Sequence, residues 1–260
     1  MKLMGVVNVT PDSFSDGGLY LDPAAAIAHG RELAAAGADI LDIGGESTRP
    51  GADEVPAAEE LRRVEPVVAG LADGEAAISI DTSKRAVAEA ALDAGAGIVN
   101  DVTALRGDPE MAPLCAERGV TVILMHMLGT PRTMQEGPSY DDVVEDVKAF
   151  LAGRVEAATA AGIAEQRIWL DPGIGFGKTA EHNLELLRRL GELSELGRPL
   201  VVGTSRKSFI GRVDGSEASE RLGGTIASSV LAAAEGAEVL RVHDVAEVGQ
   251  AMAVAGAVLG

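Results

Sequence analysis

The sequence predicts an α/β protein, a TIM (β/α)8 barrel built as a single domain from residues 1–260. Eight short runs rich in Val, Ile and Leu alternate with amphipathic, alanine-rich stretches of helical periodicity, which is the pattern of repeated strand–helix units. Each apolar run also ends abruptly in polar residues, as in barrels whose chemistry lies at the carboxyl ends of the strands. A doubly wound open sheet is the alternative, but polar residues at nearly every strand end favour a closed barrel.

The expected strands are nearly continuously apolar, because a barrel strand is covered on both faces. They span residues 3–8, 39–43, 77–80, 97–100, 121–125, 167–170, 199–203 and 238–242. The expected helices span residues 22–36, 56–72, 84–94, 109–118, 141–161, 182–190, 217–235 and 245–258. Start signals such as Asp22 before Pro23 and Asp108 before Pro109 open several helices, and glycines fall where helices should end.

Two strand-to-helix connections, residues 10–20 and 46–55, exceed the usual length of about two to six residues. Both follow strands, so both lie on the rim where the polar strand ends gather. Long rim loops rich in Ser, Thr, Asp, Gly and Pro commonly act as lids. We therefore expect these two loops to cover a site.

Charge and cysteine content exclude several classes of protein. The formal net charge of −18 argues against binding to nucleic acid or to an anionic membrane, since both need a basic face. We find no apolar stretch long enough to span a bilayer and no signal peptide at the start. The single cysteine, Cys115, excludes an internal disulfide, and we expect it to be a core thiol. A cytoplasmic protein is the resulting expectation.

Four polar residues at the ends of different strands form the most informative set: Asp81, Asn100, Asp171 and Lys207. Two carboxylates, a carboxamide and an ammonium suit a flat heterocycle that carries several N–H donors and one carbonyl. Two of them also have simpler readings. Asp81 could cap the helix that follows it, and Asp171 could form the turn at Pro172.

A second group, Asn8, Arg241 and His243, lies on the first and last strands, which are neighbours in a closed barrel. Arg241 and His243 alternate along one strand and share a face, and together they favour a phosphate or diphosphate. Asn8 could give one oxygen to Mg2+, which is held largely by substrate phosphates and water. We expect Arg241→Ala to depress turnover far more than fold stability.

Residues 173–179 (GIGFGKT) look superficially like a nucleotide phosphate loop. Pro172 stands where that motif requires its first glycine, so the spacing fails. We expect instead a flexible rim loop that carries an aromatic side chain, Phe176. Asp42 and His126, which also end apolar runs, have no assigned role.

Seven segments together closely resemble the dihydropteroate synthase family. They occur in the family's order over essentially the whole chain, and the first two are highly specific. They are residues 4–18 (MGVVNVTPDSFSDGG), 42–51 (DIGGESTRPG), 80–82 (IDT), 99–102 (VNDV), 170–179 (LDPGIGFGKT), 203–208 (GTSRKS) and 241–244 (RVHD). The resemblance implies a transferase that condenses 6-hydroxymethyl-7,8-dihydropterin diphosphate with p-aminobenzoate. The products would be 7,8-dihydropteroate and diphosphate, formed in folate biosynthesis by a dissociative mechanism.

The resemblance also implies a role for each matching residue. The pterin would be held by Asp81, Asn100, Met125, Asp171, Phe176 and Lys207. The diphosphate would be bound by Asn8, Arg241 and His243, with Mg2+ at Asn8. The p-aminobenzoate would lie among Phe14, Thr48, Arg49, Pro50 and Ser208. Asn8, Asp81, Lys207, Arg241 and His243 would be the catalytic residues.

Two other functions share this barrel and its pterin pocket: a pterin-dependent methyltransferase that binds methyltetrahydrofolate, and a non-catalytic pterin-binding paralogue. The methyltransferase would not need the lid or the Arg241 and His243 pair, and the paralogue should have lost some of these groups. The resemblance further implies sulfonamide sensitivity and a homodimer, for which the small residues 223–234 could supply a contact. Phe209 is bulky where the family has an aliphatic residue, so we expect its ring to alter the p-aminobenzoate pocket.

Overall fold

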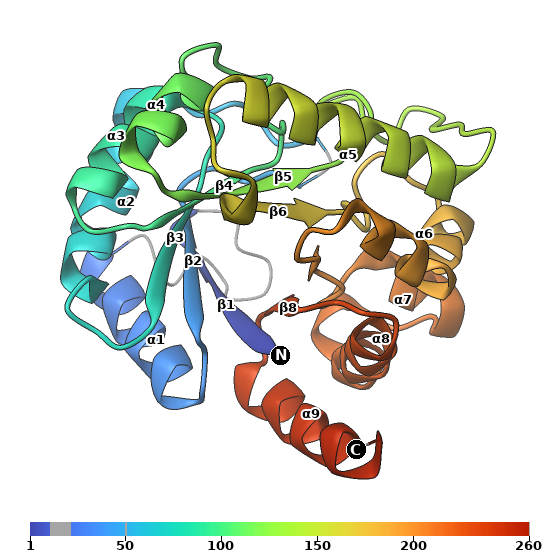
Figure 1. Cartoon of the computed structure of the whole chain (residues 1–260). Coiled ribbons are helices and arrows are strands. Elements are labelled where there is room, and N and C mark those ends of the chain that lie inside the picture. The colour runs from blue at the N-terminus through green and yellow to red at the C-terminus, as the bar shows by residue number, and fades with distance from the viewer. Residues whose placement is uncertain (11–21, 50, 260) are drawn as a thin grey trace.

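The computed structural model describes residues 1–10, 22–49 and 51–259. In these residues eight parallel strands form an inner wall that helices surround (Figure 1). The strands are β1 (Lys2–Asn8), β2 (Ile40–Gly44), β3 (Ala77–Asp81), β4 (Ile98–Asp101), β5 (Thr121–Met125), β6 (Ile168–Asp171), β7 (Val201–Val202) and β8 (Val239–Val242). All eight lie within a residue or two of the predicted ranges.

The order of the strands confirms a closed barrel. Hydrogen-bonded neighbours run β6-β5-β4-β3-β2-β1-β8-β7, and every pair is parallel. The two ends of this sheet meet at an isolated bridge between Leu170 and Leu200, where the Leu170 N–H donates to the Pro199 carbonyl at 2.9 Å. The open-sheet alternative is therefore wrong.

The α-helices of the described residues follow the predicted rhythm with one addition. They are α1 (Pro23–Ala35), α2 (Ala57–Leu71), α3 (Arg85–Asp93), α4 (Met111–Arg118), α5 (Val143–Ala160), α6 (Ala180–Arg188), α7 (Ser208–Asp214), α8 (Leu222–Ala234) and α9 (Val245–Leu259). Short 3-10 turns are η1 (Glu165–Arg167), η2 (Leu190–Leu196) and η3 (Ala218–Glu220). The prediction of one helix over 217–235 missed α7, which packs Phe209 and Ile210 into the core after strand β7.

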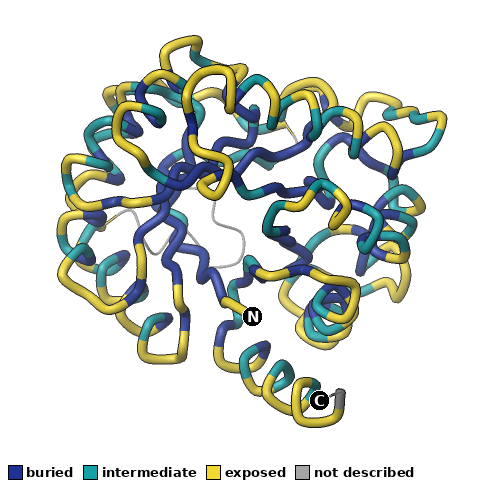
Figure 2. The backbone as a smooth tube through the Cα atoms, in the orientation of Figure 1, coloured by how far each residue is buried: buried dark blue, intermediate teal, exposed yellow. Residues whose placement is uncertain are grey.

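The hydrophobic core has two parts. A large cluster lies between the strands and the helices, so the helices are buried on their inner faces and exposed outside (Figure 2). A smaller cluster fills the interior of the barrel: Met4, Ile40, Ile98, Ile123, Val201, Val239 and the partly buried Trp169. Cys115 is fully buried in the large cluster, which confirms it as a core thiol.

Alternation along the strands places the polar residues directly above this inner cluster. Successive strand side chains point to opposite faces, so the residue two positions later points the same way. Two residues beyond members of the inner cluster come the polar Asp42, Asn100, Asp171 and Arg241 and the apolar Met125. The barrel is thus plugged by apolar side chains below and lined by polar ones at the carboxyl rim.

Candidate active site

Arg241 is the centre of the polar layer. Its Nε donates to Asp42 Oδ2 at 2.6 Å and its Nη2 donates to Asp81 Oδ2 at 2.9 Å. Burial would lower the pKa of Arg241, but Asp42 and Asp81 outweigh that effect and raise it, so the guanidinium stays charged. Burial, and then the neighbouring Asp42, raise the pKa of Asp81, while Arg241 opposes them.

This arrangement explains Asp42, which had no role in the sequence. Its side chain is fully buried, and a buried carboxylate needs partners. Asp42 Oδ2 accepts from Arg241 and, at 3.1 Å, from the Asn100 amide, so it ties two expected site residues together. The reading of Asp81 as a helix cap is wrong, because α3 begins after Lys84 and Asp81 bonds to Arg241 instead.

Asp171 and Lys207 form the second part of the layer. Burial raises the pKa of Asp171, against the opposing charge of Lys207. Burial lowers the pKa of Lys207 to about 8, Asp171 opposes this shift, and Arg241 adds to it. The Asp171 Oδ1 accepts from the Gly173 N–H at 2.7 Å, so the turn-forming reading of Asp171 is confirmed for one of its oxygens.

His243 is a neutral ring in this environment. Burial, and then the cations Arg206 and Arg241, lower the pKa of His243 to about 3. Ser205 Oγ accepts from the His243 N–H at 3.2 Å and lies 3.0 Å from the ring Nδ1. We assign the Ser205 hydroxyl as donor to Nδ1, which leaves Nε2 of His243 as a neutral N–H donor.

Arg206 forms an ion pair with Asp244. Its guanidinium donates to both carboxylate oxygens of Asp244, at 3.1 and 2.5 Å. Its backbone has a φ of +57°, a region that a non-glycine residue rarely adopts. The Arg206 N–H donates to Thr225 Oγ1 at 2.9 Å and the Arg221 guanidinium donates to its carbonyl at 3.1 Å, so this turn into Lys207 is fixed on both sides.

A cavity of about 350 Å³ opens above the polar layer. Nine of the residues singled out from the sequence line it: Asn8, Thr48, Arg49, Asp81, Phe176, Lys207, Ser208, Arg241 and His243. Three others are buried beneath the cavity and contact residues of this layer instead of lining the cavity: Asn100, Met125 and Asp171. Asn100 bonds to Asp42, and Met125 packs in one apolar cluster with Phe176, Val102, Met127 and Met134. Phe14 and Pro50 lie outside the described residues.

Strand pairing explains why these residues meet. Asp81 and Asn100 are register partners on β3 and β4, and Met125 and Asp171 are register partners on β5 and β6. Asn8 lies at the end of β1, which pairs with the β8 strand that carries Arg241. Residues far apart in the sequence therefore become neighbours once the barrel closes.

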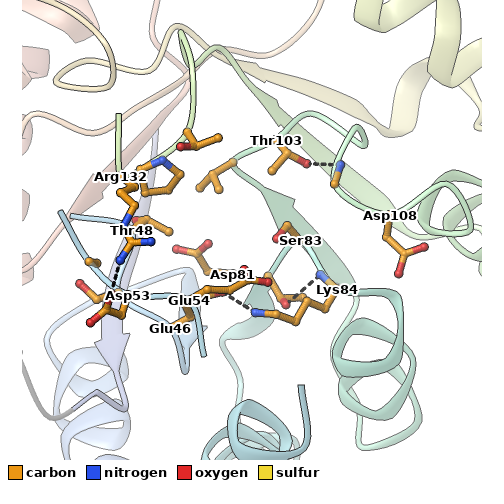
Figure 3. Close-up of a pocket in the computed structure, with 17 residues that line it drawn as sticks. Glu46, Thr48, Asp53, Glu54, Asp81, Ser83, Lys84, Thr103, Asp108 and Arg132 are labelled. Carbon is orange, nitrogen blue, oxygen red and sulfur yellow. Dashed lines mark hydrogen bonds and ion pairs between the residues drawn. The ribbon is translucent and has the colours of Figure 1, made fainter. Parts of the chain in front are cut away.

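A second cavity of about 430 Å³ adjoins the first and shares Glu46, Ser47, Thr48 and Asp81 with it (Figure 3). In it the Lys84 ammonium bonds to Glu46 and Glu60 at 2.5 and 2.6 Å. Glu46 also accepts from the Val55 N–H at 2.8 Å, so the charged group ties both ends of the loop after β2.

The connection after β5, residues 126–142, is also long, which the expectation of only two long connections missed. It contacts the loop after β2: the Gly51 N–H donates to the Pro131 carbonyl at 3.2 Å, and Arg132 bonds to Asp53 at 2.9 Å. It therefore belongs to the rim that surrounds the site.

Phe209 does not shape the cavity. It is buried in the large core cluster and is absent from the cavity lining, so the expectation that its ring alters the p-aminobenzoate pocket is wrong. Ser208, one residue earlier, is exposed and lines the cavity.

The residues of this site do not build a metal cage by themselves. No group of three or more His, Cys, Asp or Glu side chains suited to a metal occurs among the residues that the structure describes. A magnesium ion that keeps its waters and binds chiefly to substrate phosphates needs only one or two protein oxygens. The half-buried Asn8, which lines the cavity with Arg241 and His243, fits that single role.

Comparisons with known proteins agree with this geometry. Residues 4–243 match a family model described as a pterin binding enzyme. The dihydropteroate synthase of Escherichia coli K12 is 49% identical over 258 residues, which cover 99% of this chain and 91% of that protein. The dihydropteroate synthase of Neisseria meningitidis serogroup C is 50% identical and is covered over 88% of its length.

Solved structures give the same result. The Yersinia pestis dihydropteroate synthase in a sulfonamide drug complex matches with a TM-score of 0.97 and 46% identity over 99% of this chain and 94% of that one. The Xanthomonas albilineans enzyme in complex with 7,8-dihydropteroate matches with a TM-score of 0.90 and 48% identity over 100% and 94%. The chain is therefore a transferase that belongs to the pterin-binding enzyme family and, within it, to the dihydropteroate synthases.

Proposed function

We propose that the rim cavity condenses 6-hydroxymethyl-7,8-dihydropterin diphosphate with p-aminobenzoate, releasing 7,8-dihydropteroate and diphosphate. One observation carries the assignment of the site: Asp81, Asn100, Asp171 and Lys207 gather in one layer around Arg241, beside the cavity that Asn8 and His243 line. Family membership supplies the reaction, and the geometry supports the distribution of roles.

The pterin binds against the buried polar layer. The Asp171 and Asp81 carboxylates accept hydrogen bonds from pterin N–H groups, the Asn100 amide bonds to the ring edge, and the Lys207 ammonium donates to the ring carbonyl or a ring nitrogen. Met125 and Phe176, which belong to one apolar cluster, cover the faces of the ring. Burial makes each of these hydrogen bonds selective, because a ligand that lacks one partner leaves a desolvated group unpaired.

The diphosphate binds to Arg241, His243 and Asn8. A guanidinium has five N–H donors, and the bonds to Asp42 and Asp81 use two, which leaves three for the leaving group. His243 donates through Nε2 as a neutral ring. Mg2+ bound at Asn8 would neutralise part of the charge on the diphosphate.

The p-aminobenzoate lies on the outer side of the cavity, where Thr48, Arg49 and Ser208 supply donors to its carboxylate. Phe14 and Pro50 complete this subsite in our proposal. Sulfonamides should compete at the same place.

The chemical step is dissociative. The bond between the pterin methylene carbon and the diphosphate oxygen breaks, and its electron pair leaves with diphosphate. Asp81 and Asp171 stabilise the positive charge left on the pterin, while Arg241 and His243 stabilise the departing anion. The lone pair of the arylamine then forms the new C–N bond, and the proton on that nitrogen passes to solvent. A neutral arylamine attacking a cation needs no strong general base.

A homodimer is part of the proposal. Leu231 of α8 and Val254 of α9 are 62% and 61% exposed on two helices that pack against each other, so each offers an apolar side chain that a second copy could bury. Gly224 of the small-residue stretch already packs against Ile210 within the chain. A Leu231→Asp variant that keeps the wild-type mass in light scattering would contradict this interface.

A cytoplasmic location is also proposed, because Cys115 is a buried free thiol and free thiols are typical of reducing compartments. Among the described residues we find no helix long and apolar enough to cross a membrane.

The assay that tests the function mixes the protein with Mg2+, the pterin diphosphate and p-aminobenzoate, and measures dihydropteroate by chromatography. We expect dihydropteroate and diphosphate in equal amounts. Pterin binding without any product would instead support a non-catalytic pterin-binding paralogue. Methyl transfer from methyltetrahydrofolate without dihydropteroate would support the methyltransferase.

A further inference from the structure

The loop between β6 and α6, residues 172–179, contains a buried lysine that the proposed mechanism does not use. Lys178 is 3% exposed, and its Nζ lies 2.8 Å from His126 Nδ1, 3.0 Å from the Gly173 carbonyl and 3.0 Å from the Phe176 carbonyl. The three acceptors match the three N–H donors of an ammonium. Both carbonyls belong to the loop itself.

This set of partners is unusual for a buried lysine. Lys84, another lysine near the rim, bonds instead to the carboxylates of Glu46 and Glu60, which offset the desolvation of its charge. The direct partners of Lys178 are all neutral, and burial lowers the pKa of its ammonium to about 7 while Asp171 opposes the shift, so holding the charge has a cost in stability that an apolar side chain would not incur. Such a cost is typical of a group retained for geometry or function.

The loop is bonded at each carbonyl from residue 173 to residue 177. Lys178 bonds to those of Gly173 and Phe176, the Lys207 ammonium bonds to that of Ile174, Gln135 donates to that of Gly175 at 2.9 Å, and Tyr140 donates to that of Gly177 at 2.6 Å. The expectation of a flexible rim loop is therefore wrong. A Cβ on Gly173 would lie 1.9 Å from the His126 carbonyl, so the loop also lies directly against β5.

The loop presents three groups to the proposed pterin subsite. The Phe176 ring centroid lies 4.7 Å from Lys207 Nζ, the Ile174 carbonyl bonds to the same ammonium, and the Gly173 N–H bonds to Asp171. Lys178 bonds to the carbonyls of Gly173 and Phe176, the first and the last of the three residues that present these groups. His126 in turn is fixed by its own N–H, which donates to the Asp171 carbonyl at 2.9 Å, and by the Phe150 ring 4.9 Å away.

We infer that Lys178 is a positioning residue for the pterin substrate: its ammonium, anchored on His126, holds the β6–α6 loop so that Phe176, Lys207 and Asp171 meet the ring in one fixed arrangement. The inference rests on the proposed function and adds a residue that contacts no substrate. It predicts that loss of Lys178 weakens the recognition of pterin and leaves the p-aminobenzoate subsite nearly intact, because Thr48 and Arg49 lie on the loop after β2 and Ser208 begins α7.

The test uses Lys178→Met, which keeps the length of the side chain and removes its donors. Lys148→Met is the matched control, since Lys148 lies on α5, pairs with Glu195 and does not line the cavity. For Lys178→Met we expect KM for the pterin diphosphate and Kd for 6-hydroxymethylpterin to rise about tenfold, while KM for p-aminobenzoate stays within about twofold. Lys148→Met should leave all three values unchanged.

A double-mutant cycle with Phe176→Leu separates positioning from general loosening. If Lys178 acts through the loop, Phe176→Leu should weaken pterin binding much less in the Lys178→Met background than in the wild type. Additive effects, an equal rise of both KM values, or an unchanged pterin Kd in a cooperatively melting Lys178→Met protein would each overturn the inference. If that variant does not fold, His126→Leu is measured in the same way, and we expect about a threefold rise in pterin Kd. An unchanged Kd there would overturn it.

Pterin binding also separates this inference from the proposed function. A wild-type protein that binds pterin but makes no dihydropteroate contradicts the function, and the Kd of Lys178→Met still decides the role of the lysine. A productive wild type with an unaffected Lys178→Met contradicts the inference alone.

Discussion

Replacing Arg241 with methionine removes the one guanidinium that joins both carboxylates to the proposed leaving-group site. In the structure it donates to Asp42 and Asp81, and its own side chain is 22% exposed. The variant therefore combines a structural loss with a catalytic one. The sequence predicted that turnover would fall far more than fold stability, and the two buried carboxylates on one arginine add that the loss of stability should itself be substantial.

The size of the structural loss follows from the burial of its partners. Removing one partner of a buried ion pair costs about 3–5 kcal/mol, because an uncompensated charge stays behind. The Asp42 side chain is fully buried and would keep only the Asn100 amide as a partner for Oδ2. If the wild type is stable by about 5 kcal/mol, a loss of about 3 kcal/mol leaves roughly 97% of the molecules folded. Unfolding alone cannot then explain a large fall in rate.

The catalytic loss should be much larger than the unfolded fraction. Removing one preorganised donor to a developing anion typically lowers kcat by about 10²–10³-fold. We expect a fall of that size in dihydropteroate formation at 25 °C, measured together with urea unfolding of the same preparation. Arg189→Met is the control: it loses ion pairs to Asp142 and Glu192 outside the cavity lining and should keep kcat within about twofold.

The pH dependence of stability gives a second signature of the same variant. Burial and Asp42 raise the folded-state pKa of Asp81 above its unfolded value, and Arg241 opposes them. A carboxyl with a raised folded pKa is most favourable to folding below its unfolded pKa, and this contribution is lost as pH rises through the folded pKa. Without Arg241 the folded-state pKa rises further, so the stability deficit of Arg241→Met should grow as pH rises through the wild-type Asp81 pKa of about 8, between about pH 7 and pH 9.5. A pH-independent deficit, or a folded variant with wild-type kcat, would refute the reasoning.

Three further predictions concern single groups. Burial lowers the pKa of Lys207 to about 8, so kcat/KM for the pterin diphosphate should fall above about pH 8 as the ammonium is lost. Lys207→Arg should move that fall in kcat/KM to higher pH. If the fall stays at the same pH in Lys207→Arg, Lys207 is not its source. Asn8→Ala should raise the Mg2+ concentration for half-maximal rate several-fold without changing the Kd for 6-hydroxymethylpterin, and an unchanged Mg2+ requirement would remove Asn8 from the metal site. Burial raises the pKa of the Cys115 thiol to about 12, so iodoacetamide at pH 8 should label it only in urea, whereas rapid labelling of the native protein would contradict its burial.

Most of the fold could be predicted from the sequence because each barrel strand is covered on both faces and therefore reads as an apolar run. Helix α7 was missed because it is only seven residues long and begins directly after Lys207, with no intervening turn residues. The connection after β5 was passed over although the predicted strand ends at residue 125, the predicted helix begins at residue 141, and the stretch between them contains two glycines and two prolines. Its importance comes from contacts with other loops, which the sequence does not show.

The prediction of the site succeeded for residues at strand ends. It failed for residues whose role depends on hydrogen-bond partners that are distant in the sequence. Asp42 ends an apolar run, but its strand continues to Gly44, and a charge within a buried strand signals a buried pair. That signal could have identified it as a structural partner but could not name Arg241. Lys178 gave less warning, because a lysine in a glycine-rich loop is ordinarily exposed, and only the closed barrel brings His126 beside it.

A crystal structure of the protein with 6-hydroxymethylpterin bound tests the central claim most directly, since two adjoining cavities compete for the ligand. We predict that the ring edge bonds to Asp171, Asn100 and Lys207 and that the ring lies against Met125 and Phe176, with its hydroxymethyl group directed toward Arg241. A pterin bound instead in the neighbouring cavity beside Ser83, Lys84 and Asp108 would contradict the account.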